Sequence, residues 1–140
     1  MRYLGLDLGT KTLGVAVSDK TGLIATSLTI LRHDNDYEYL IEELKKIIKE
    51  KGIETIVLGL PKNMNNTIGE RGEMVLSFKE KLEESISLPV ILEDERLTTK
   101  VAENILISAD VSRKKRKKVI DKMAANVILQ SYLDRRNNGR

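Results

Sequence analysis

The chain has 140 residues, of which 41% are hydrophobic, and its formal net charge is +3. This length fits a single domain over residues 1–140, and the absence of cysteine excludes a disulfide scaffold and thiolate chemistry. There is no apolar run of membrane-spanning length and no signal segment after Met1, so we expect a cytoplasmic protein. Aromatic residues are few, which argues against a base-stacking platform.

The charges are unevenly distributed along the chain. Residues 113–140 carry 10 basic and 2 acidic side chains, whereas residues 1–112 carry 14 basic and 19 acidic ones. A basic segment attached to an acidic body predicts a polyanionic partner that is bound from one side.

The sequence YLGLDLGTKTLGVAVSD, residues 3–19, predicts two antiparallel strands joined by a loop at residues 9–12. Asp7 lies within the first apolar strand, where a charge is costly unless it is paired or binds a metal. An Asx-type turn, with Asp7 accepting hydrogen bonds from the loop backbone, is the alternative explanation. Thr10 and Lys11 place donors beside Asp7 that would suit a phosphate.

Strand and helix patterns alternate in the next part of the chain. Residues 23–31 predict a third strand, and residues 37–51 predict a helix that ends before Gly52. His33 lies in the connection between them, where we expect an exposed loop residue. It is the only histidine, so histidine-based catalysis would lack a second participant.

Residues 53–60, IETIVLGL, are nearly all apolar, which predicts a strand covered on both faces. The polar loop at residues 61–67 follows the carboxyl end of this strand, where open α/β sheets bind ligands. A plain connection is the alternative. Thr67 and Glu70 have the spacing of a capping box, which predicts that the next helix begins there.

A fifth strand is predicted at residues 88–92, followed by three consecutive acids, Glu93, Asp94 and Glu95. These acids repel one another, and a divalent cation would make their proximity favourable. The alternative is a helix start capped by Thr98, where acids interact favourably with the helix dipole. Arg96 could orient a carboxylate or hold a phosphate with two hydrogen bonds.

Six consecutive cations occupy residues 113–118. They predict contacts with a nucleic-acid backbone, with a solvated surface as the alternative, and part of this segment is expected to become ordered on substrate binding. The last helix is predicted to begin near Val119, and Asp121 flanks its inward stripe or interacts with the helix dipole. That predicted stripe consists of Ile120, Met123, Ala124, Val127, Ile128, Ser131 and Tyr132.

Together these elements predict an α/β fold. An antiparallel three-stranded half followed by crossover βα units gives a five-stranded mixed sheet with helices on its faces. Acids from the first strand, the end of the fifth strand and the last helix can converge in this layout. Three or four carboxylates without histidine or cysteine would bind Mg²⁺ or Mn²⁺, and two such ions would support in-line hydrolysis of a phosphodiester.

Four motifs occur along the chain in the order GLDLGTKTLGVAVSD, VLGLPKNMNNT, EDERLTT and IDKMAANVILQSYL. Together they resemble the YqgF (RuvX) family, relatives of the RuvC-type Holliday-junction resolvases, over essentially the whole chain. The resemblance implies an RNase H-like fold with strand order 32145, an antiparallel second strand and helices on both faces. It also implies a metal-dependent nuclease that trims the 5′ end of precursor 16S rRNA, with cleavage of branched DNA as the alternative.

The resemblance places the family's acids on Asp7, Glu95 and Asp121, with Asp94 as a further candidate metal ligand. We expect two Mg²⁺ or Mn²⁺ ions at these acids when substrate is bound. One departure is Asn65–Asn66, where the family usually has Asp-Gly, although both pairs tolerate left-handed turns. The expected substrate contacts are Thr10, Lys11, Pro61, Asn63, Arg96, Thr98, Arg113, Lys114, Lys115 and Arg116.

Two other functional classes compete with a nuclease. The sequence DLGTKT also resembles the phosphate loop of actin-like and sugar-kinase ATPases, but those proteins need a second lobe to close on the nucleotide. A non-catalytic RNA-binding factor in ribosome assembly would bind RNA equally well with and without Mg²⁺. Both a monomer and a homodimer are compatible with the sequence.

Overall fold

The computed structural model describes residues 1–62, 65, 67–95 and 112–138, and for residues 113–122 it describes the backbone alone. Within these ranges no helix has the length and apolar character that crossing a membrane requires.

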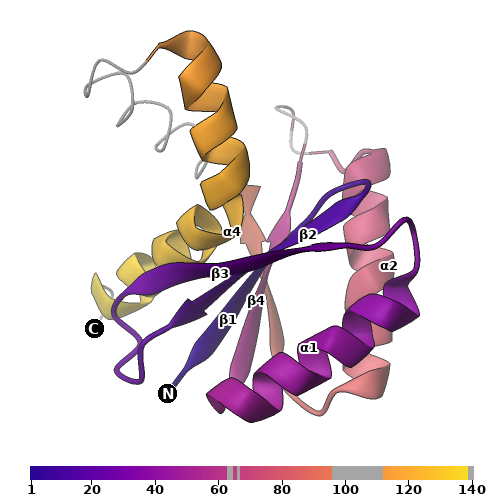
Figure 1. Ribbon diagram of the computed structural model, residues 1–140, viewed down its shortest axis with the longest axis vertical. Helices are drawn as coiled ribbons and strands as arrows, with labels where there is room; N and C mark the ends of the chain where they lie inside the picture. Colours follow the sequence, from indigo (N-terminus) through magenta and orange to yellow (C-terminus); the bar gives the residue numbers. More distant parts are fainter. Residues whose placement is uncertain (63–64, 66, 96–111, 139–140) are drawn as a thin grey trace.

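A five-stranded mixed sheet forms the centre of the molecule (Figure 1), as the sequence predicts. Its strand order is β3-β2-β1-β4-β5, and β1 pairs antiparallel with β2 and parallel with β4. This arrangement confirms the predicted order and the three-stranded antiparallel half. The strands are β1 (Tyr3–Leu8), β2 (Thr12–Ser18), β3 (Ala25–Arg32), β4 (Thr55–Leu60) and β5 (Val90–Asp94).

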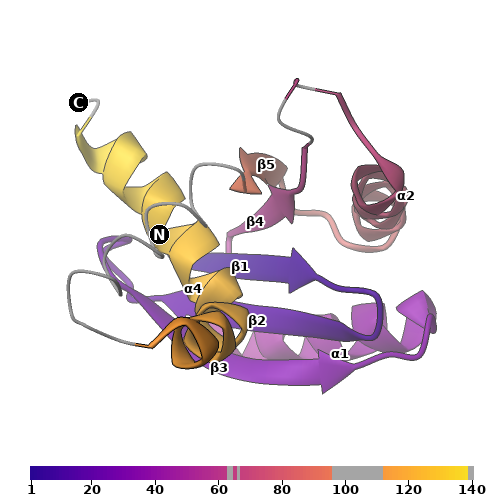
Figure 2. The same ribbon diagram turned by 90° about the horizontal axis from the view of Figure 1, so that it is seen from above.

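Helices cover both faces of the sheet (Figures 1 and 2). Helices α1 (Tyr37–Lys51) and α2 (Glu70–Ser85) pack on one face, and α4 (Arg113–Asn138) crosses the other. Leu4 and Leu6 of β1 belong to the core beneath α1 and α2, whereas Tyr3 belongs to the smaller core beneath α4. The alternation along β1 therefore decides which side chains face α4.

The ends of α1 confirm the sequence prediction. The carboxylate of Asp36 accepts a hydrogen bond from the amide of Tyr39, and Gly52 ends the helix in the left-handed region with φ 67°. Such a residue at C′ is usually glycine because a Cβ is strained there.

The predicted capping box of α2 is wrong. The helix begins at Glu70 with Gly69 as its N-cap, and no side chain caps it. The hydroxyl of Thr67 instead donates to Oδ1 of Asn65 at 2.6 Å, within the preceding loop. Asn65 therefore competes for the hydroxyl that the capping box requires, as short polar side chains in turns commonly do.

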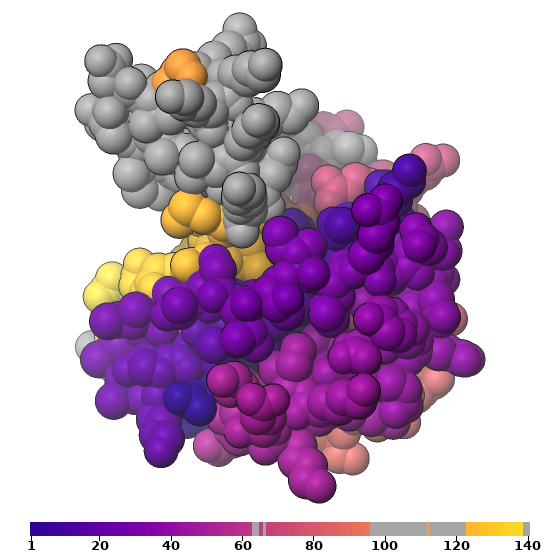
Figure 3. Space-filling view, viewed as in Figure 1, coloured from indigo at the N-terminus to yellow at the C-terminus, as the bar shows by residue number. Residues whose placement is uncertain are grey.

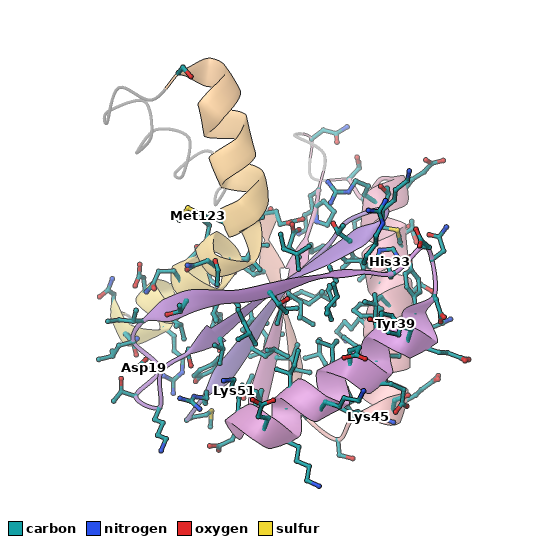
Figure 4. The ribbon with its side chains drawn as sticks, viewed as in Figure 1. Asp19, His33, Tyr39, Lys45, Lys51 and Met123 are labelled. Carbon is teal, nitrogen blue, oxygen red and sulfur yellow. The ribbon has the colours of Figure 1, made fainter. Side chains whose placement is uncertain are left out.

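Helix α4 also differs from its prediction. It begins at Arg113, so the backbone of the six consecutive cations is helical. Its buried stripe is rotated relative to the prediction, because Ala125 and Leu129 are buried whereas Met123 is 41% exposed (Figure 4). Among residues 123–138, the part of α4 whose side chains are described (coloured in Figure 3), the buried residues are Ala125, Ile128, Leu129 and Leu133.

Three glycines of the sheet let α4 lie directly on the strands. A Cβ on Gly5 of β1 would lie 2.6 Å from Cβ of Leu129, and one on Gly59 of β4 would lie 2.5 Å from Cδ1 of Ile128. A Cβ on Gly14 of β2 would lie 3.4 Å from Cβ of Ala125. The first two distances are too short for any side chain, so the glycines set the approach of α4 to the sheet.

Candidate active site

Asp7 lies on the face of the sheet that α4 crosses. It follows Tyr3 and Gly5 at the period-two spacing of a strand, and both of these residues contact α4 or its core. Its partner on β2 is Gly14, which presents no side chain. The side chain of Asp7 is thus half-buried on a central strand, and the neighbouring Gly14 leaves space beside it.

Glu95 reaches Asp7 from the end of β5. The side chain of Glu95 passes over β4 at Gly59, where a Cβ would lie 3.0 Å from its carboxyl carbon. Its carboxyl group is hydrogen-bonded to that of Asp7. The structure thus brings together two of the predicted site residues, and the glycine of β4 provides the space for their contact.

The environment of the carboxyl pair favours a bound proton on Glu95. Burial, the hydrogen bond to Asp7 and the negative charge of Asp7 together raise the pKa of Glu95 to about 9. Two carboxylates in contact cannot both ionise unless a positive charge compensates them. A proton or a hard cation can supply that charge, and the oxygen donors suit Mg²⁺ or Mn²⁺.

Glu93, the first of the three consecutive acids, has a structural role. It is 3% exposed, and Arg135 of α4 donates to both of its oxygens, from Nη1 at 2.9 Å and from Nη2 at 2.6 Å. This hydrogen bonding raises the pKa of Arg135. The pair neutralises Glu93 and ties β5 to the C-terminal half of α4.

The other predicted acids contribute less to the described site. Asp94 alternates with Glu93 along β5, so it points toward the face covered by α1 and α2, although its charge still raises the pKa of Glu95. Asp121 belongs to α4, one turn before Ala125, and its side chain lies outside the described residues. No three acids or histidines with a described side chain come close enough to share a metal.

Arg71 is a site residue that the sequence analysis missed. It is the second residue of α2, and its Nη2 donates to the carbonyl oxygen of Leu8 at 3.2 Å. Its positive charge lowers the pKa of Glu95 and so opposes the effect of Asp7. Nothing in the local sequence signals this position, because an exposed arginine in a first helical turn usually faces solvent.

His33 is buried, so the prediction of an exposed loop residue is wrong. It is 2% exposed, its Nδ1 accepts from the amide of Asn35 at 2.8 Å, and its Nε2 lies 3.0 Å from the carbonyl oxygen of Gly9. Because Nδ1 is the acceptor, the neutral ring carries its proton on Nε2 and donates it to Gly9. His33 therefore fixes the loop at residues 9–12, which begins two residues after Asp7 (Figure 4).

Backbone hydrogen bonds hold the loop beside Asp7 in place. The amide of Gly9 donates to the carbonyl oxygen of Thr12 at 2.7 Å, and the carbonyl oxygen of Lys11 accepts from the amide of His33 at 3.0 Å. Thr10 and Lys11 are exposed within this loop. Their side chains are thus available to a ligand that approaches the carboxyl pair.

The remaining predicted substrate contacts are only partly described. Pro61 is half-buried, and its carbonyl oxygen would lie 2.9 Å from a Cβ on Gly72, so the loop after β4 packs against the start of α2. Several other positions lie outside the described residues. They are Asn63, Arg96, Thr98 and the side chains of Arg113, Lys114, Lys115 and Arg116.

The fold is that of the RuvC-type resolvases. The RuvC of Thermus thermophilus, solved in complex with a Holliday junction, matches with a TM-score of 0.61 and 15% identity, covering 97% of this chain and 95% of that one. A Holliday junction resolvase of fowlpox virus matches with a TM-score of 0.52 and 13% identity over 96% of this chain and 99% of that one. A ROK family protein of Streptococcus pneumoniae has a TM-score of 0.52 and 18% identity, but the match covers 76% of this chain and 38% of that one.

The chain belongs to the RuvX family, described as Holliday junction resolvases, whose model matches residues 1–135. A relative from Geobacillus kaustophilus is 62% identical over 135 residues, which are 96% of this chain and 98% of the relative. One from Bacillus subtilis is 57% identical over 138 residues, covering 98% of this chain and all of the relative. Both carry the provisional name pre-16S rRNA nuclease.

Proposed function

We propose that this protein is a metal-dependent nuclease that hydrolyses phosphodiester bonds at the 5′ end of precursor 16S rRNA. The substrate follows from the names of relatives that are up to 62% identical over nearly the whole chain. The observation that carries the chemistry is the hydrogen-bonded pair of Asp7 and Glu95. Paired carboxyl groups of this kind are arranged to exchange a proton for a cation.

Asp7 and Glu95 fit a divalent metal because their oxygens are hard donors and because their contact is favourable only with a compensating positive charge. Asp121 of α4 and Asp94 of β5 are the further candidate ligands. When bound, one or two Mg²⁺ or Mn²⁺ ions would lower the pKa of a water molecule and stabilise negative charge on the phosphate.

The chain's own residues position the substrate. Lys11 and Thr10 present donors from the loop that His33 fixes, on one side of Asp7. Arg71 presents its guanidinium from α2, close enough to affect Glu95, and only Nη2 has a hydrogen-bonding partner among the described residues. Its other donors are therefore suited to a phosphate oxygen. Arg96 and the cations of residues 113–118 are further candidates for backbone contacts.

The test is cleavage of a 5′-labelled precursor 16S rRNA end, with Mg²⁺ or Mn²⁺ and with chelator. The wild-type protein should release a product only with metal, and Asp7→Asn and Glu95→Gln should each lower the rate by at least about 100-fold. Glu38→Gln, which removes an exposed charge from the first turn of α1, is the matched control and should cleave normally. Cleavage by Asp7→Asn at the wild-type rate would exclude this site.

Resolution of Holliday junctions is the second candidate function. It is favoured by the description of the family model and by the similarity of the fold to RuvC. A four-way DNA junction in a parallel reaction decides between the two. Metal-dependent cleavage of the junction in preference to the rRNA end would assign the carboxyl pair to branched DNA. A non-catalytic factor would instead bind RNA equally with and without Mg²⁺ and would release no product.

A further inference from the structure

None of the described helices covers one part of the sheet face that carries Asp7. Figure 2 shows that α4 stands over the sheet near one end, whereas no described helix crosses the carboxyl ends of β1 and β3 on this face. The strand register places Asp7 beside Gly14, and Gly14 beside Ile30 of the edge strand β3. Ile30 is therefore two strands from Asp7, which corresponds to about 10 Å at the usual spacing of strands.

Ile30 and Arg32 point to the same side as Asp7. The residue between them, Leu31, pairs with Leu13 and packs against the opposite core, so its two neighbours face the other way. Ile30 is 52% exposed. The side chain of Arg32 is 73% exposed, and its approach to Asp34, at 4.0 Å between Nε and Oδ1, is too long to hold the guanidinium firmly.

Thr12 connects these residues to the loop beside Asp7. It pairs with Arg32 across β2 and β3, and its Oγ1 would lie 3.4 Å from a Cβ on Gly9. The uncovered area thus contains a hydroxyl, an apolar side chain and a cation. This combination matches the phosphate, the sugar or base, and the next phosphate of a polynucleotide.

We propose that Thr12, Ile30 and Arg32 form a binding subsite for a single-stranded polynucleotide segment next to the cleaved phosphate. This inference rests on the proposed nuclease function and adds the direction of the strand, from Asp7 across β2 to the edge at β3. Arg32 binds a phosphate, and Ile30 contacts a sugar or an unpaired base. A base within a duplex would present its edge rather than its face to Ile30, so the segment is single-stranded.

Two observations favour a polynucleotide over a second copy of this chain. Exposed Lys11 and Arg32 lie along the path, so a second copy would place these cations together, and exposed Asp34 beside Arg32 offsets only part of that charge. In addition, β3 continues the surface that begins at Asp7, where the proposed substrate is cleaved. The alternative explanation for the charge of Arg32 is that it prevents the edge strand β3 from pairing with another chain. This explanation predicts no effect of Arg32 on nucleic-acid binding.

The experiment measures the anisotropy of a fluorescent single-stranded RNA oligonucleotide with the full-length protein in EDTA, where no cleavage occurs. The double variant Ile30→Ser/Arg32→Ser should bind about 5- to 20-fold more weakly. The slope of its log affinity against log salt concentration should fall by the amount that about one phosphate contact contributes. The matched control is Ile24→Ser/Lys20→Ser, which removes an exposed isoleucine and an exposed cation at the other end of the β2–β3 hairpin. It should bind like the wild type.

The outcomes separate this subsite from the nuclease function. Weaker binding by the β3 variant supports the subsite even when the wild type cleaves nothing with metal. Equal weakening by the two double variants, or an equal loss of affinity for a duplex of the same sequence, overturns it while leaving the nuclease proposal intact. A change of sedimentation coefficient in the β3 variant without a change in RNA binding would also overturn it and would assign β3 to contacts between copies.

Discussion

The carboxyl groups of Glu95 and Asp7 are hydrogen-bonded to each other across Gly59, although the two residues are far apart in the sequence. This contact explains why β4 has a glycine at the position where most strands would place a side chain. It also explains why an ionisable residue is tolerated in the middle of β1. A shared proton stabilises the pair, and in the proposed metal site a cation would replace that proton.

The metal-free protein should lose stability as the pH rises. Glu95 has a folded pKa of about 9 and an ordinary value of 4.5, so between these values the folded state holds a proton that the unfolded state releases. The free energy of unfolding should therefore fall with pH, by at most about 1.4 kcal/mol per unit. Urea denaturation in EDTA between about pH 5 and pH 9, for the wild type and for Glu95→Gln, measures this contribution as the difference in slope. Parallel curves for the two proteins would show that Glu95 ionises normally.

Gly59→Ala should damage both the fold and the site. Its Cβ would lie 2.5 Å from Cδ1 of Ile128 and 3.0 Å from the carboxyl carbon of Glu95, so both of these side chains must shift. We expect a loss of about 1–3 kcal/mol in the free energy of unfolding, together with slower cleavage. Gly14→Ala is the matched control, because its Cβ would meet Ala125 at 3.4 Å, and it should cost less than about 1 kcal/mol. Equal stability of the two variants would contradict the tight packing of Ile128 and Glu95 over Gly59.

Replacing His33 should release the loop that carries Thr10 and Lys11. His33→Phe keeps the ring but leaves the carbonyl of Gly9 and the amide of Asn35 without their partner, at a cost of about 1–3 kcal/mol. His33→Gln offers one donor and one acceptor and should retain more stability. In a cleavage assay the Phe variant should raise KM for RNA more than it lowers kcat, since the carboxyl pair is intact. A normal KM in the Phe variant would indicate that the loop needs no such support.

The architecture of the sheet was predictable because each element carries its own signal. These signals are local in sequence. They are the apolar run of β4, the glycine-containing loop after β1 and the helical periodicity of α1. The acid in β1 was also recognisable, because an in-strand aspartate conflicts with the propensity of its neighbours.

The contacts that complete the site depend on residues distant in sequence and were not predictable locally. His33 is buried because the carbonyl of Gly9 and the amide of Asn35 need its ring, and Arg71 reaches the site because α2 begins beside the end of β1. The orientation of α4 follows from glycines on three strands, which shift the contact from Met123 to Ala125. The sequence shows Glu93 only as one of three consecutive acids, and its structural role became clear from its partner Arg135 on α4.

Arg71→Met should distinguish a phosphate contact from a structural role. If the guanidinium holds the substrate, KM for RNA should be about 10-fold or more higher in the variant. The free energy of unfolding should fall by only about 1 kcal/mol, the contribution of the lost hydrogen bond to the carbonyl oxygen of Leu8. Arg71→Lys retains the charge and should recover part of the affinity, but not the paired hydrogen bonds. A large loss of stability with an unchanged KM would assign Arg71 to the fold alone.

The central claim is that Asp7 and Glu95 exchange a shared proton for a divalent cation. Calorimetric titration of the wild-type protein with Mn²⁺ near neutral pH, in two buffers that differ in ionisation enthalpy, tests it most directly. We predict binding with release of about one proton, and loss of both the binding and the proton release in Asp7→Asn and in Glu95→Gln. Unchanged Mn²⁺ affinity in either variant, or binding without proton release in the wild type, would contradict the claim.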